Sequence, residues 1–258
     1  MQQQTSFGPL TLITPTAAMK ASVHGGRAKC LQRLVRIDMP VPVTVALSFD
    51  AVHAAAIGDL PDMDALLAPF GDAPLLSVRP SSQDPDWGGP SAILNVGMND
   101  ARYAELINYV GEEAATRVYL RFVQSYAIHV ARLDPDEFHI PDVVDPASLL
   151  TMMATYEIET DEPFPQDASV QLAEVLRSMA RAWDGTTARL LRQAKGAPAD
   201  AGLGLVVQAM ALGKGHGECG QGVIQFVDST TGAPRIVGRY ISSWLAEVRD
   251  CLLYTSPS

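Results

Sequence analysis

Short runs of aliphatic residues, separated by stretches rich in glycine, proline and aspartate, predict where the strands of this chain lie. The runs cover residues 10–13, 43–49, 75–78 and 93–96, and a longer, almost continuous run covers 203–212. An apolar run of this length, bounded by turn residues, is typical of a buried strand. We therefore predict a strand at each of these positions.

Apolar residues at helical spacing predict helices between these strands. The spacing is helical after Gly25-Gly26, within 50–70, throughout 100–131 and again from Leu172 to Trp183. Residues 134–162 carry many carboxylates, and we expect this acidic segment to be irregular and solvated. The spacing of its carboxylates matches no ligand pattern, so we predict no metal site there.

Glycines cluster between residues 213 and 222, where the pattern G-x-G-x-x-G occurs. A helix follows this pattern in a dinucleotide-binding fold, but here the next element is a predicted strand at 223–227. We therefore reject the dinucleotide interpretation and predict a hairpin in which a glycine-rich tip joins strands 203–212 and 223–227. A Walker A loop is excluded as well, because Lys214 is not followed by serine or threonine.

Composition narrows the class of partner. The chain has 258 residues and a formal net charge of −10, and it lacks the lysine and arginine clusters that neutralise a nucleic-acid backbone. We therefore predict no nucleic-acid partner. A mononucleotide stays open as a partner, because it needs only a few local cations.

The sequence also bears on localisation. It holds no run of about 18 apolar residues that would predict a membrane-spanning helix. The N-terminus lacks the basic and apolar regions of a secretory signal. Three widely separated cysteines, Cys30, Cys219 and Cys251, favour a reducing compartment. We expect a cytoplasmic protein without a membrane partner.

Two arginines stand at positions that suit an anion. Arg79 follows the 75–78 run and precedes a loop that contains Gly88, and its planar fork matches phosphate or carboxylate. Arg27 follows Gly25-Gly26 at the start of a helix, where free N–H groups and the helix dipole favour a phosphate. The pattern alone leaves the ordinary alternatives open, namely an arginine that caps a loop and a plain glycine turn.

Several blocks of the sequence resemble the nucleotide-binding part of the pyruvate, phosphate dikinase family. Ser77-Val78-Arg79 and Leu94–Asp100 match that family's S-V-R-S-G-A and L-N-x-G-L-N-D blocks, and the spacing between the two fits without a gap. Phe164–Asp167 is similar to F-P-Q-D-P in the family. Gly88 is what remains here of the family's M-P-G-M-M-D-T block.

The resemblance implies an α+β fold, an ATP-grasp-like nucleotide-binding domain with mixed sheets flanked by helices. This domain would extend over residues 1–250, with the acidic irregular segment 134–162 inside it, and we expect it to be incomplete at the C-terminal end. Residues 251–258 match nothing in the family, and we expect them to form an exposed tail.

The resemblance also implies a set of nucleotide-binding residues: Arg27, Arg79, Gly88, Gln208 and Met210. Arg27 stands where the family has a lysine that contacts ATP. The positive charge is kept, but a planar guanidinium replaces a compact ammonium group. Gln208 and Met210 belong to the strand that runs along the nucleotide in ATP-grasp folds. The residue type alone lets Gln208 either offer its amide to the ligand or bond a neighbouring segment. No catalytic residue is assigned.

Two functions are compatible with these implications. In the first, the chain is the ATP-binding domain of a pyruvate, phosphate dikinase-like phosphotransferase and passes phosphate from ATP to a histidine on a separate phosphocarrier domain. The T-S-H-A motif of that histidine domain is absent, so the chain alone is not expected to complete the reaction. In the second, the chain is a catalytically degenerate nucleotide-binding or regulatory module.

Arg239 favours the second function. The family has a glutamate at this place that helps to hold the metal and the nucleotide, and an arginine cannot ligate a cation. Glu218 or Glu247 would have to replace that carboxylate. The sequence therefore predicts ATP as a ligand, leaves the need for Mg²⁺ open and assigns no metal ligand.

Overall fold

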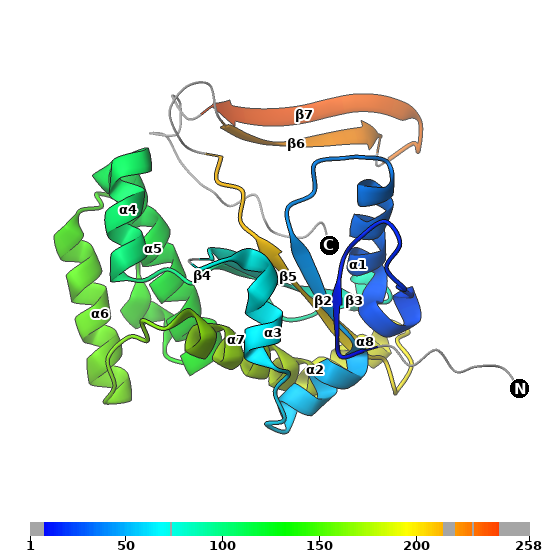
Figure 1. Cartoon of the computed structure of the whole chain (residues 1–258), viewed down its shortest axis with the longest axis horizontal. Helices are drawn as coiled ribbons and strands as arrows, with labels where there is room; N and C mark the ends of the chain where they lie inside the picture. Colours follow the sequence, from blue (N-terminus) through cyan, green and yellow to red (C-terminus); the bar gives the residue numbers. More distant parts are fainter. Residues whose placement is uncertain (1–7, 73, 214–219, 229, 243–258) are drawn as a thin grey trace, which may run out of the picture.

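The fold is built on a five-stranded sheet with helices on both faces (Figure 1). The computed structural model describes residues 8–72, 74–213, 220–228 and 230–242. The strand order is β1-β2-β5-β3-β4. The strands are β1 (Leu10–Leu12), β2 (Thr44–Leu47), β3 (Leu76–Ser82), β4 (Ile93–Val96) and β5 (Leu203–Ala209). The predicted strands are thus confirmed at all of these positions, with ends that differ by a few residues.

Side chains alternate across the sheet and divide the core into two layers. On one face Ala46 and Val206 pack with Ala28 of helix α1 (Ala21–Arg36). On the other face Leu47 and Leu205 belong to a much larger cluster, which includes residues of α2 (Phe49–Ala56) and α7 (Ala168–Asp184). Each face of the central strand β5 is therefore buried under a different layer.

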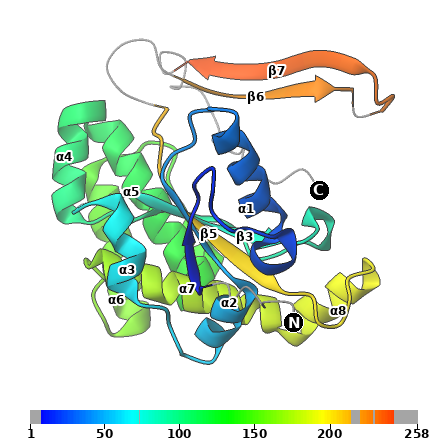
Figure 2. The ribbon, with the colours of Figure 1, turned by 45° about the vertical axis from the view of Figure 1, so that its right-hand side comes forward.

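The large cluster extends into a helical region on the far side of the molecule from α1 (Figures 1 and 2). Its centre is α5, where the fully buried aromatic rings of Tyr119, Phe122 and Tyr126 meet Phe164 edge to face. The remaining α-helices are α3 (Met63–Leu67), α4 (Asp100–Val110), α5 (Glu112–Tyr126), α6 (Pro146–Thr160) and α8 (Thr186–Ala194). The short helices are η1 (Ala68–Phe70), η2 (Pro85–Trp87), η3 (Ala127–Ala131) and η4 (Pro135–Phe138).

The expectation of mixed sheets is wrong for the described strands, because every pairing is antiparallel. β5 lies between β2 and β3 and runs opposite to both. It reaches this place through the long helical segment after β4, and a connection of that length does not fix the direction of the next strand. The α+β class and the helices flanking the sheet are as expected.

The expectation of an irregular acidic segment at 134–162 is wrong for most of its length, because Pro146–Thr160 forms α6. Asp145 caps the helix by accepting a hydrogen bond from the backbone N–H of Ser148. Leu149, Met152 and Tyr156 then bury one face at helical spacing. The charge of the segment hid this apolar stripe, although the carboxylates lie at or near the two ends of the helix.

The predicted hairpin between 203–212 and 223–227 is also wrong. β6 (Gly220–Val227) pairs with β7 (Pro234–Ser242) in a separate two-stranded sheet, whereas β5 stays in the main sheet. A tight turn joins β6 to β7, in which the carboxylate of Asp228 accepts hydrogen bonds from the backbone of Thr230 and Thr231. Closing a short loop costs less entropy than closing a long loop, so β6 pairs with β7, which is nearer to it in the chain.

The β6–β7 sheet lies apart from the main sheet in both views (Figures 1 and 2). Several large apolar side chains on it face solvent. Ile224 is 62% exposed, Phe226 66% and Ile236 76%.

No helix in the described part of the chain is both long and apolar enough to cross a membrane. Residues 251–258, expected to form a tail, lie outside the described residues.

Helix α1 docks on β3 through a glycine that interrupts it. Gly25 has φ +83° and ψ 169°, a conformation that glycine adopts almost alone. A Cβ atom at Gly25 would lie 1.7 Å from the carbonyl oxygen of Ser81. The helix therefore approaches the sheet more closely than any other residue type would permit.

Gly25→Ala tests this close approach against Gly71→Ala as a matched control. Gly71 has nearly the same backbone angles, φ +79° and ψ −167°, but a Cβ there would meet nothing within 4 Å. Both substitutions carry the conformational strain of about 1–3 kcal/mol. We expect Gly25→Ala to lower the free energy of unfolding by a further 1–3 kcal/mol or so, because backbone atoms must move. Urea denaturation measures both losses, and equal losses would contradict the docking described here.

Candidate functional site

The start of α1 is fixed to the sheet by one serine. The hydroxyl of Ser81 donates a hydrogen bond to the carbonyl oxygen of His24 over 2.7 Å and accepts one from the backbone N–H of Ala28 over 3.1 Å. All three groups are buried. The turn at Gly25-Gly26 and the helical segment after it are thus held at one place on β3.

This docking positions Arg27. Its Nε donates a hydrogen bond to the carbonyl oxygen of Pro80 over 2.8 Å, and its side chain is half-buried. No other hydrogen bond of Arg27 is found within the described ranges. The bond to Pro80 fixes the guanidinium plane and leaves the terminal nitrogens for an anion.

Arg79 lies on the same face of the sheet as the start of α1. The sequence placed it at the end of a strand, but β3 continues to Ser82, so Arg79 stands in the middle of the strand. Its position two residues before Ser81 puts both side chains on the α1 face. Burial first, and then the positive charge of Arg79, lower the pKa of Arg27. The two guanidinium groups are therefore close enough for their charges to interact.

Gln208 shares this face but is held by a neighbouring strand. It stands opposite Ser77 on β3 and Thr44 on β2. The side-chain nitrogen of Gln208 donates a hydrogen bond to the hydroxyl of Thr44 over 2.8 Å, and both side chains are buried. Of the two roles that the residue type allows, the structure shows the bond to a neighbouring segment.

Met210 follows the end of β5. Its backbone N–H donates a hydrogen bond to the carbonyl oxygen of Leu75 over 2.8 Å. The side chain is partly buried and packs against the large cluster. The contact holds the chain leaving β5 close to the start of β3.

Gly88 lies away from the two arginines. It follows η2 with φ +80°, and the adjacent Gly89 packs near the ring of Pro80 and the indole of Trp183. Because Pro80 follows Arg79 in the strand, its ring is on the opposite face of the sheet. The structure thus gathers Arg27, Arg79 and Gln208 on the α1 face and puts Gly88 on the α7 side.

The α1 face can bind an anion. It combines two neighbouring guanidinium groups with the start of a helical segment, and both features favour phosphate. No group of three or more histidine, cysteine, aspartate or glutamate side chains that could hold a metal gathers among the described residues. The carboxylates considered as metal ligands, Glu218 and Glu247, lie outside that range, as does the side chain of Arg239.

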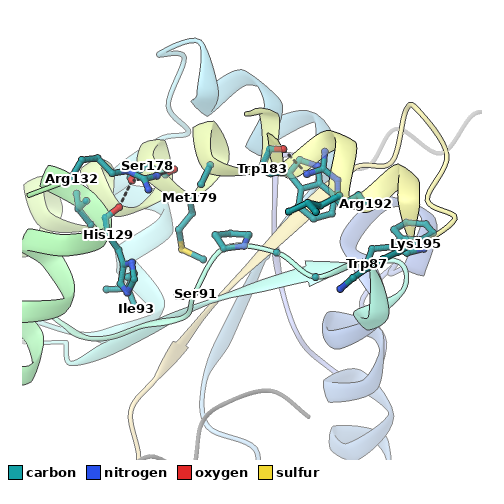
Figure 3. Close-up of a pocket in the computed structure, with 17 residues that line it drawn as sticks. Trp87, Ser91, Ile93, His129, Arg132, Ser178, Met179, Trp183, Arg192 and Lys195 are labelled. Atoms are coloured by element: carbon teal, nitrogen blue, oxygen red, sulfur yellow. Dashed lines mark hydrogen bonds between the residues drawn. The ribbon is translucent and has the colours of Figure 1, made fainter. Parts of the chain in front are cut away.

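Sequence reasoning missed a second group of cations. Arg132, Arg192 and Lys195 line a cavity of about 410 Å³ together with Gly88, Trp87 and other residues (Figure 3). These residues come from η2, η3, α7 and α8, so no local motif joins them.

Comparison with known proteins gives a consistent but partial relationship. The chain is 28% identical over 194 residues to pyruvate, phosphate dikinase of Clostridium symbiosum, which covers 67% of this chain and 22% of that protein. The Rhizobium meliloti protein of the same name is 28% identical over 193 residues, with the same coverage. Pyruvate, phosphate dikinase 1 of Oryza sativa subsp. japonica is 25% identical over 259 residues, which covers 87% of this chain and 27% of that protein.

No family model matches the chain. The chain spans about a quarter of the length of the curated relatives it matches. The resemblance expected from the sequence is therefore confirmed in its coarse form: the chain is a partial and divergent relative of pyruvate, phosphate dikinases, and the similarity points to a phosphotransferase-related domain.

Proposed function

We propose that this chain is the ATP-binding part of a pyruvate, phosphate dikinase-like phosphotransferase. The observation that carries the proposal is the pair Arg27 and Arg79, which lie together on the α1 face in a chain similar to those enzymes. Each arginine stands in a sequence motif of its own, and the two positions lie 52 residues apart in the chain (79 − 27).

Electrostatics supports a phosphate ligand between the two arginines. Two like charges held close together, one of them half-buried, raise the energy of the empty site. A polyphosphate removes that repulsion and accepts charge-assisted hydrogen bonds from both guanidinium groups. The net charge of the chain is −10, so this cationic pair is a local feature.

The proposed fold assignment is ATP-grasp-like, with the nucleotide lying along β5 and β3 near Gln208. In the proposed reaction, phosphate from ATP passes to a histidine on a phosphocarrier domain. The curated relatives are about four times longer than the matched region, which leaves room in them for such a domain. The transfer requires the metal and in-line geometry common to ATP-dependent phosphoryl transfer.

The second candidate function is a degenerate nucleotide-binding or regulatory module. It is favoured by Arg239, which lies on β7 opposite Val223 and stands in the sequence where the family has a metal-holding glutamate. In this function ATP binds and does not react. The two functions differ in whether Mg²⁺ strengthens ATP binding.

Arg79→Ala tests the proposed phosphate contact. We expect the variant to bind ATP more weakly by about 1.5–3 kcal/mol, which is the range for a hydrogen bond to a charged group. Adenosine, which carries no phosphate, should bind both proteins equally. Isothermal titration calorimetry measures each affinity.

The control for this experiment is Arg117→Ala. Arg117 is an arginine on α5 that pairs with Glu113 over 3.1 Å, so its removal changes the net charge equally. ATP affinity should stay within about twofold of the parent protein. An equal loss in both arginine variants would refute a specific role for Arg79.

ATP titration with and without Mg²⁺ separates the two functions. The degenerate module predicts weak ATP binding that changes little on adding Mg²⁺, because an arginine occupies the place of the metal-holding carboxylate. Arg239→Glu should then make binding depend on Mg²⁺. A gain of about tenfold or more, roughly 1.4 kcal/mol, on adding Mg²⁺ to the unaltered chain would instead favour an intact kinase site.

A further inference from the structure

The cavity on the α7 side of the sheet has cations at both ends (Figure 3). Arg132, directly after η3, lies at one end, and Arg192 and Lys195, from the last part of α8 and just after it, lie at the other. Met179 lies between them in the close-up. The volume of about 410 Å³ is within the range of small-ligand sites.

The charge of the cavity is opposite to the charge of the chain. The sequence has 29 acidic and 19 basic residues, yet no aspartate or glutamate is among the residues that line this cavity. Within the described part of the chain, no ion pair involves Arg132, Arg192 or Lys195. Their positive charges therefore act on whatever enters the cavity.

Neutral groups hold the two arginines in place. Arg192 is 7% exposed, donates a hydrogen bond to the carbonyl oxygen of Trp183 over 2.6 Å and lies 3.6 Å above the indole ring. Arg132 donates a hydrogen bond to the hydroxyl of Ser178 over 3.3 Å. Ser178 in turn donates one to the carbonyl oxygen of His129 over 2.7 Å. Positioned cations lose little entropy when an anion binds.

Much of the lining of the cavity is apolar. Ile93 and Met179 are buried, and both line the cavity together with Pro90 and Trp87. A purely inorganic anion would leave these surfaces against water, and a neutral apolar molecule would leave the cations without a partner. The combination fits a molecule with an apolar body and acidic groups.

We propose that this cavity is a second ligand site, which binds an elongated organic anion with an acidic group at each end and an apolar ring between them. Arg132 binds one acidic group, and Lys195 with Arg192 binds the other. The site lies across the sheet from Arg27 and Arg79 and is independent of the proposed ATP site.

A titration with 4-carboxyphenyl phosphate tests the proposal on the full chain. This probe carries an acidic group at each end of a benzene ring. Indole N–H signals of Trp87 and Trp183 in NMR spectra report binding, and Trp87→Phe and Trp244→Phe assign the three tryptophan signals of the chain. We expect saturable shifts, with phenyl phosphate and benzoate binding at least tenfold more weakly, because each lacks one acidic group.

Charge reversal at each end gives the decisive comparison. Arg132→Glu and Lys195→Glu should each weaken the probe at least tenfold, whereas Arg33→Glu on α1 should leave it within twofold. Arg33 is exposed, lies across the sheet from the cavity and does not line it, so it is a control of equal charge change. Ala188→Trp should block binding at unchanged charge by filling the cavity.

Three results would overturn the proposal. The first is the absence of saturable binding. The second is equal affinity in the Lys195→Glu, Arg132→Glu and Arg33→Glu variants. The third is loss of probe binding in Arg79→Ala, which would move the probe to the α1 face. A failure of ATP to bind the chain would leave this proposal standing, since neither Arg27 nor Arg79 lines the cavity.

Discussion

Alternation of side chains along β5 is the constraint on which the rest of the molecule depends. β5 lies between β2 and β3, so each of its side chains packs into one of the two layers that cover the faces of the sheet. Val206 packs under α1, and Leu205 packs under the layer of α2 and α7. A shift of one residue in its register would exchange the two sets and bury polar Gln208 in the large cluster.

The same alternation separates the two cationic regions. Arg79 and Pro80 are neighbours in β3, and their side chains therefore belong to opposite faces. The backbone links the regions all the same, because the carbonyl oxygen of Pro80 anchors Arg27 while its ring packs near Gly89. An acidic chain thus has two places where cationic side chains gather, and one short segment of β3 borders both.

How much the sequence predicted depends on how local each feature is. The strands and most helices follow from apolar runs and spacing, which are local properties, and β1 to β5 were found as expected. The sequence motifs around Arg27 and Arg79 also singled out these two arginines, which lie on the same face of the sheet. The Gln208–Thr44 bond was predictable only as one of two alternatives, because the partner lies 164 residues away.

Where the sequence and the structure differ, tertiary packing is the common cause. The family resemblance implies a nucleotide-binding role for Gly88, and the structure puts this residue on the other face of the sheet from the two arginines. The carboxylates of residues 134–162 predict an irregular segment, but the apolar positions Leu149, Met152 and Tyr156 are buried and belong to helix α6. The cavity cations come from separate segments, and their meeting is a product of tertiary packing.

The β6–β7 sheet has a practical consequence for handling this protein. No described strand pairs with the outer edges of this two-stranded sheet, and unpaired backbone groups at an edge accept strands from other molecules. Here the edges are combined with exposed Ile224, Phe226 and Ile236, and a sheet of this size is only marginally stable alone in water. Self-association of the isolated chain would begin at this ribbon, so its solution behaviour should depend on concentration. A charged residue at Ile236, away from both cationic regions, is the natural change for improving solubility.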